Sequence, residues 1–109
     1  MTVYVDDLKQ GFRGMVMCHM VADTDEELHA VAEKIGLKRS WWQSPAKGGS
    51  HYDLSLSKRT AAIQNGAIEV SMRVLSAMNF RRKVTGELGS PEDAVAFLKL
   101  WAQGNRHGR

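Results

Sequence analysis

Alternation of apolar and polar residues predicts two strands near the start of the chain. Val3 and Val5 fall on one face of an extended segment, while Tyr4 and Asp6 fall on the other. Residues 15–21 form a second apolar segment after two turn-like glycines, and both faces of this segment are apolar. Because strands with two apolar faces are typical of sheet interiors, we expect 15–21 to be an internal strand.

Apolar residues at helical spacing predict three helices. The clearest begins after Thr24, whose capping box with Glu27 is typical of a helix start, and it ends at Gly36. The other two are expected from between residues 53 and 57 to Gln64, and from Pro91 to Gly104.

Two further strands are expected at residues 37–43 and 67–72. In the second of these, alternation predicts that Ile68, Val70 and Met72 point inward. Strands that alternate with helices along a chain are typical of α/β proteins, so the order of the elements predicts that class.

The predicted fold is a single small α/β domain over residues 1–104, with an about four-stranded mixed or parallel sheet and three helices. Residues 74–78 are expected to form a helical turn, and 79–89 a loop or hairpin edge. Residues 105–109 are expected to be a basic disordered tail.

Composition indicates a small globular protein that folds alone. The chain has 109 residues, of which 43% are hydrophobic and 25% charged, both ordinary values for a single domain. Its sequence contains no apolar run near the roughly 20 residues that span a membrane, so no membrane association is expected. Cys18 is the single cysteine, which excludes an internal disulfide and favours a reducing, cytoplasmic location.

Positive charge is concentrated in the second half of the chain. Residues 55–109 carry nine Lys and Arg against four Asp and Glu, whereas residues 1–54 carry six against eight. The densest basic run is 81–83. A basic region favours nucleic acid or another polyanion as partner, and a solvated surface is the alternative interpretation.

The strongest candidate for a ligand site is the segment around the second predicted helix start. Lys58 and Arg59 lie near the first turn of that helix, where each cation opposes the helix dipole at a cost of about 0.3–1 kcal/mol. Two cations, free backbone N–H groups and a glycine-rich loop would together bind phosphate or carboxylate. Alternatively, Asp53 or Ser55 caps the helix, and the cations reach solvent or nearby acids.

Acidic residues and histidines provide candidates for metal or acid–base chemistry. Asp6 and Asp7 follow the first strand and are candidate ligands of Mg²⁺ or Mn²⁺, although neighbouring strand residues point to opposite faces and a turn cap is the alternative. The catalytic candidates are His19, His51 and Asp53. These three would form an acid–base or metal cluster with Asp6 if the strand ends converge, and the alternative for His19 is a hydrogen-bonded core residue. The spacings match no zinc motif.

Aromatic and polar residues complete the candidate binding set. Trp42 or Tyr52 would stack on a base, and His51 and Asp53 would orient the ligand. Gln43 lies in the same polar region. For the tryptophan, the alternative is that a helix covers it.

Several segments in the first 73 residues are distinctive. They read MTVYVDD, MCHMVADTDEELHAVAEKIG, WWQSP, GSHYDLSLSKR and NGAIEVS. Together they resemble a family of small phage and bacterial proteins of unknown function, DUF4031. The later stretch MNFRRKVTGELGSPEDA resembles an extension found in some members. The resemblance implies a phage or prophage origin and a cytoplasmic setting, and it assigns no catalytic residue.

The leading hypothesis from the sequence is a small phage-type binding protein that recognises an anionic ligand, a nucleotide or nucleic-acid phosphate, in an accessory or counter-defence role. One alternative is an enzyme, a phosphoesterase or nuclease that uses Mg²⁺ or Mn²⁺. Another is an interaction protein that docks on a host factor through its basic half. A homodimer is compatible with a domain of this size.

Overall fold

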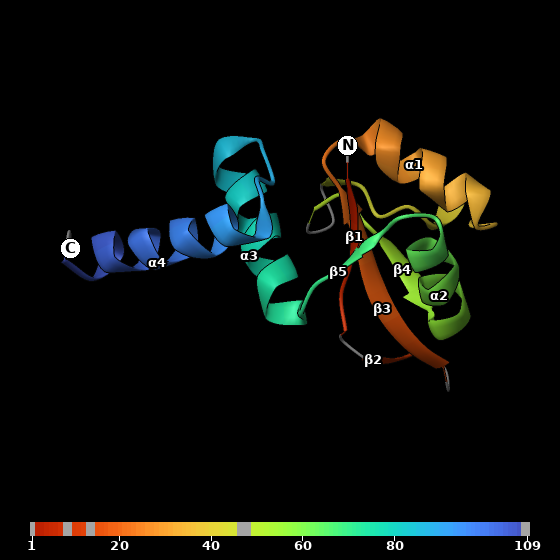
Figure 1. Ribbon diagram of the computed structural model, residues 1–109. Coiled ribbons are helices and arrows are strands. Elements are labelled where there is room, and N and C mark those ends of the chain that lie inside the picture. The colour runs from red at the N-terminus through yellow and green to blue at the C-terminus, as the bar shows by residue number, and fades with distance from the viewer. Residues whose placement is uncertain (1, 8–9, 13–14, 46–48, 108–109) are drawn as a thin grey trace.

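A mixed sheet between two pairs of helices forms the protein (Figure 1). The computed structural model describes residues 2–7, 10–12, 15–45 and 49–107. The strands are β1 (Val3–Val5), β2 (Gln10–Phe12), β3 (Met15–Ala22), β4 (Tyr52–Ser55) and β5 (Ile68–Glu69). The helices are α1 (Asp25–Lys34), the short 3₁₀ helix η1 (Arg39–Trp41), α2 (Leu56–Gln64), α3 (Met72–Thr85) and α4 (Pro91–His107). The predicted α/β class is confirmed.

Strand β3 is the centre of the sheet, as its two apolar faces predicted. It pairs antiparallel with β1 and β2 along one edge and antiparallel with β4 along the other. Met20, for example, lies opposite Val5 on one side and Tyr52 on the other. Strand β5 adds to the far side of β1 in parallel, which makes the sheet mixed.

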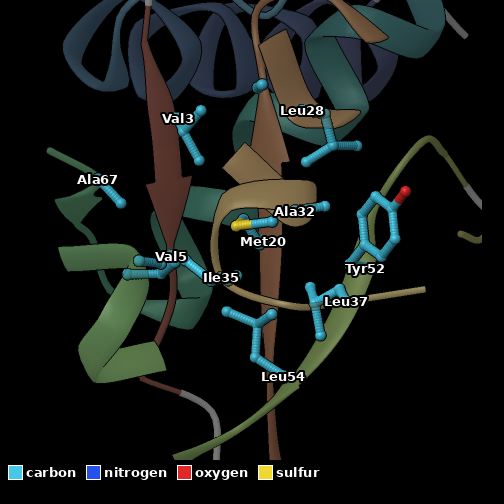
Figure 2. Close-up of a cluster of buried hydrophobic side chains, with 12 residues drawn as sticks. Val3, Val5, Met20, Leu28, Ala32, Ile35, Leu37, Tyr52, Leu54 and Ala67 are labelled. Atoms are coloured by element: carbon cyan, nitrogen blue, oxygen red, sulfur yellow. The ribbon is translucent and has the colours of Figure 1, made fainter. Parts of the chain in front are cut away.

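Helices α1 and α2 cover the first face of the sheet. Figure 2 shows the core beneath them, where Val5, Met20 and Leu54 from three strands pack with Leu28 and Ile35 from α1 and its C-terminal end. Because side chains alternate along a strand, the residues between these buried positions point to the opposite face. The second face therefore carries Tyr4, Asp6, His19, Val21 and Asp53.

Helices α3 and α4 cover part of this second face. Leu75 and Met78 of α3 pack on Tyr4 and Val21 of the sheet, and Ala94 of α4 joins the same cluster. Beyond this contact α4 extends away from the sheet (Figure 1). Within the residues described, none of the helices combines the length and apolarity needed to cross a membrane.

One of the predicted strands is wrong, and another is shorter than predicted. Residues 37–43 contain η1 instead, because only the first of them, Leu37, is buried in the core and the alternation is not sustained. The strand that pairs with the free edge of β3 is instead β4, whose four residues are too few for a clear period-2 signal. In the predicted strand 67–72, only Ile68 and Glu69 belong to a strand, and Ile68 and Met72 are 47% and 41% exposed, not inward.

The C-terminal third is more helical than predicted. Helix α3 occupies the predicted turn and most of the predicted loop, so the described residues form four α-helices, not three. Ser71 caps its start, where the hydroxyl accepts a hydrogen bond from Val74 N, and Gly86 ends it in the left-handed conformation. The basic residues in its second half interrupt the apolar stripe that would have predicted it. Helix α4 also continues past Gly104 to His107, and residues 108–109 lie outside the described chain.

Gly49 is a position where only glycine fits. Its φ is +110°, and a Cβ atom there would collide with the side-chain amide of Asn79. Gly66 has a similar φ of +96° but open space around it. We predict that Gly66→Ala costs about 1 kcal/mol of unfolding free energy from backbone strain, and that Gly49→Ala costs at least about 1 kcal/mol more. Urea unfolding of the two variants tests this, and equal losses would contradict the close approach of Gly49 and Asn79.

Candidate metal centre

Three neighbouring strands place one polar residue each in a row on the second face of the sheet. His19 of β3 lies directly opposite Asp53 of β4 in the antiparallel register. On the other side of β3, Asp6 follows the last residue of β1, and its backbone N donates to His19 O at 3.0 Å. The sheet register therefore aligns Asp6, His19 and Asp53 side by side.

His51 joins this row from the same side of the sheet. It lies two residues before Asp53, so alternation points both side chains to the second face. An isolated bridge to Gln43 holds its backbone, with Gln43 N donating to His51 O and His51 N to Gln43 O. The rings of His19 and His51 lie 5.6 Å apart in an edge-to-face arrangement.

One nitrogen of each imidazole is held by a hydrogen bond. His19 Nδ1 lies 2.9 Å from Asp6 Oδ2, and His51 Nδ1 lies 2.7 Å from the carbonyl oxygen of Gly49. Because a carbonyl oxygen only accepts, His51 Nδ1 carries the proton. The remaining nitrogens, Nε2 of both rings, face the Asp53 carboxylate.

The three free ligand atoms converge on one point. Asp53 Oδ1 lies 3.7 Å from His19 Nε2 and 3.5 Å from His51 Nε2, and the three atoms lie within 4.8 Å of one another. A tetrahedral zinc ion with bonds of about 2.0–2.1 Å keeps its ligand atoms about 3.3 Å apart. Small shifts would thus bring all three atoms onto one ion. Two imidazoles and one carboxylate also form the protein ligand set of several catalytic zinc and non-haem iron sites.

A pocket of about 200 Å³ opens beside these ligands. Asp6, His19 and His51 form its polar wall. The other lining residues are Val21 of β3 and four residues of α3, which are Met72, Leu75, Ser76 and Asn79. A bound ion would therefore have space next to it for water and for a small part of a substrate.

Electrostatic effects in the cluster favour charged forms. The hydrogen bond to Asp6 raises the pKa of His19 above its ordinary value, against the opposing effect of burial. The adjacent His51 ring lowers the pKa of Asp53, against the opposing effect of burial, and this favours the ionised carboxylate. His29, which lies outside the cluster, has a lowered pKa because of burial and the nearby Arg39.

The two cations of the predicted anion site are engaged elsewhere. The Lys58 ammonium donates at 2.7 Å to the carbonyl oxygen of Ile35, at the C-terminal end of α1. Arg59 donates through Nε to the Asp6 carbonyl at 2.7 Å and through Nη2 to Glu69 at 3.1 Å. The described residues that line the pocket do not include either cation. The long Lys58 side chain thus carries its positive charge away from the positive N-terminal end of α2 and places it at the negative C-terminal end of α1.

The remaining sequence candidates make other contacts. Asp7 accepts a hydrogen bond from Met72 N at 2.7 Å, so it caps the start of α3. The ring of Tyr52 is buried in the first core with its hydroxyl on His29 Nδ1, so it is not available to stack on a base. The Trp42 ring packs edge-to-face on His29, and its Nε1 donates to Ser50 Oγ. Gln43 contributes the backbone bridge to His51.

The pocket wall on α3 was not found from the sequence, because that segment was expected to be a turn and a loop. The polar row could have been found from strand alternation, since His19 lies between buried Cys18 and Met20, and Asp53 between buried Tyr52 and Leu54. What alternation does not provide is the register that sets these residues opposite one another.

The two histidines with shifted pKa values should titrate on opposite sides of pH 6.5. We predict that the pKa of His19 lies above about 6.5, the ordinary value, and that of His29 below it. The His19–Asp6 pair then stabilises the fold fully below pH 6.5, and this contribution is lost as the pH rises through the folded pKa of His19. Histidine NMR titration of metal-free protein measures both values, and the reverse order would contradict the Asp6 contact.

The hydrogen bond from Lys58 to the Ile35 carbonyl should stabilise the folded protein. We predict that Lys58→Met, which keeps the apolar stem, lowers the unfolding free energy by about 1–3 kcal/mol because the Ile35 carbonyl loses a charged donor. The matched change on the exposed surface of α4, Lys99→Met, should change it by less than about 0.5 kcal/mol. Thermal and urea unfolding give the comparison. Equal stability together with a loss of phosphate binding would instead support Lys58 as a ligand residue.

Comparison with known proteins identifies a family for this chain. Residues 3–82 match a family model described as a protein of unknown function, DUF4031. No curated protein and no solved structure matches the chain. The matched region includes Asp6, His19, His51 and Asp53 together with most of α3, and it ends before α4. The chain therefore belongs to the DUF4031 family.

Proposed function

We propose that the protein is a metal-dependent hydrolase of phosphate esters, in which His19, His51 and Asp53 hold one divalent transition-metal ion. The observation that carries this proposal is the convergence of two imidazole nitrogens and one carboxylate oxygen at the edge of a pocket. Each imidazole has its other nitrogen held in place, so neither ring has to turn to reach the ion.

The ligand set favours a transition metal over magnesium. Imidazole suits Zn²⁺ and related ions, whereas Mg²⁺ prefers oxygen ligands and retains several waters. Three protein ligands leave coordination positions open for water and substrate, which distinguishes catalytic from structural zinc sites. Such an ion supplies a nucleophile at neutral pH by lowering the pKa of bound water to about 7.

Charge around the pocket favours an anionic substrate. The carboxylates of Asp6 and Asp53 would balance the two charges of a bound divalent ion. Arg82 is half-buried and donates to three neutral acceptors, which are Ala22 O, Ser50 O and Asn79 Oδ1. Asn79 lines the pocket and Ser50 precedes His51, so this positive charge lies behind the pocket wall. The negative charge of a phosphate group would be attracted both to the ion and to the positive charge of Arg82.

The proposed reaction is the hydrolysis of a phosphorus–oxygen bond. A water oxygen forms a bond to phosphorus and loses a proton, while the bond to the leaving oxygen breaks and that oxygen takes up a proton to give the alcohol. Nucleotides and nucleic acids are the phosphate esters that we propose as substrates. The single cysteine, Cys18, is buried and supports the further proposal of a cytoplasmic setting, in a bacterium or a phage-infected cell.

Metal binding provides the first test. We predict that chelator-stripped protein binds one equivalent of Zn²⁺ or Mn²⁺ in calorimetric titration, and that Asp53→Asn weakens binding at least tenfold, roughly the minimum for a lost contact at such a site. Asp93→Asn is the matched control, because it changes an exposed carboxylate on α4 and should leave the affinity unchanged. Equal affinity in the two variants would contradict the assigned site.

Hydrolysis provides the second test. The metal-loaded protein should cleave bis(p-nitrophenyl) phosphate or a short oligonucleotide, and the rate should fall with EDTA and with Asp53→Asn. Metal binding without hydrolysis of phosphate monoesters, diesters or nucleotides would overturn the enzymatic proposal. Metal-dependent binding of nucleotides in that case would favour the anion-binding protein expected from the sequence.

A further inference from the structure

We propose that Asp6 is the positioning residue of this centre: its buried carboxylate holds the neutral His19 ring with its proton on Nδ1 and so leaves Nε2 free for the metal. This inference rests on the proposed metal function. In this arrangement Asp6 does not touch the ion itself but acts through His19, which would bind it.

The Asp6 side chain is directed entirely at His19. Its Oδ1 accepts the backbone N–H of His19 at 2.8 Å, and its Oδ2 lies 2.9 Å from His19 Nδ1. The residue is 1% exposed, so this carboxylate has been removed from water. Burying a carboxylate is costly unless hydrogen bonds compensate it, and here both oxygens are compensated by the same residue. Such an arrangement fixes both the position and the orientation of the ring.

The backbone of Asp6 is held as firmly as its side chain. Its N–H donates to His19 O at 3.0 Å, which continues the ladder between β1 and β3. Its carbonyl accepts Arg59 Nε at 2.7 Å from α2 on the other face of the sheet. The carboxylate therefore has little freedom to rotate toward the ion site, and its role is to act on the ring.

An ionised carboxylate accepts hydrogen bonds and does not donate them, so its partner nitrogen must carry the proton. The neutral His19 ring then has its lone pair on Nε2, on the side of Asp53. The opposite tautomer would point an N–H bond at the ion and exclude ligation. Carboxylate partners of this kind also increase the basicity of the ligand, and their loss typically weakens metal binding 10–100-fold.

His51 offers an internal reference. Its Nδ1 bonds to the Gly49 carbonyl, a backbone group that a side-chain substitution at Asp6 leaves in place. Both rings are thus expected to have the proton on Nδ1 in the metal-free protein, and only one of them depends on a removable side chain. A change at Asp6 should alter His19 while His51 stays as it is.

The test reads the tautomers directly. In metal-free wild-type protein at a pH where both rings are neutral, the ¹⁵N shifts of His19 and His51 should show protonated Nδ1 and unprotonated Nε2. In Asp6→Asn, the amide oxygen still accepts from His19 N, so the amide N–H group faces Nδ1 and His19 should change to the Nε2–H form. Zn²⁺ affinity should then fall 10–100-fold. Asp7→Asn is the matched control, because Asp7 bonds to Met72 N.

Each outcome of this experiment either supports or overturns the positioning role of Asp6. A wild-type His19 with its proton on Nε2 overturns the inference without the need for any variant, so poor folding of Asp6→Asn does not obscure the answer. An unchanged tautomer in folded Asp6→Asn overturns it as well, and so does a changed tautomer with unchanged Zn²⁺ affinity. If wild-type protein shows the expected tautomer but binds no metal, the proposed function fails, and the role of Asp6 toward a metal fails with it.

Discussion

The antiparallel pairing of β3 with β1 on one side and β4 on the other is the constraint on which the rest of the structure depends. Its register places His19 opposite Asp53 and beside Asp6. The same pairing places Met20 between Val5 and Tyr52 in the core of the first face. A shift of one residue would exchange the two faces, so that the polar row would enter the apolar core. Core packing and the arrangement of the candidate centre are thus fixed by one set of hydrogen bonds.

Local signals in the sequence were enough to predict part of the fold. Thr24 and Glu27 form the capping interactions that mark the start of α1. The two apolar faces of β3 correctly predicted its internal position. The cap of α1 and the apolar faces of β3 depend on residues a few positions apart, so a short segment of sequence is enough to predict each of them. By contrast, η1 was missed because none of its residues is buried, and α3 was missed because basic residues obscure its few buried positions.

The candidate centre depends on contacts that no local pattern contains. Asp6, His19, His51 and Asp53 were each singled out by residue type, but their convergence follows from strand register and from a bridge between Gln43 and His51. Lys58 shows the opposite case. Its place near a helix start suggested an anion site, yet its ammonium reaches a carbonyl 23 residues earlier in the chain. Charge and residue type thus indicate which side chains could bind a ligand or metal, and only the tertiary arrangement shows which of them lie in the same site.

The location of the proposed ligands on paired strands has a consequence for ion selectivity. His19 and Asp53 extend from backbone that is hydrogen-bonded to neighbouring strands, and His51 from a bridge, so the donor atoms are largely preorganised. A preorganised set binds with a small entropic cost, but it adapts poorly to ions of different radius or coordination number. The rigid β-sheet scaffold would therefore discriminate by size and geometry against large, oxygen-seeking cations such as calcium.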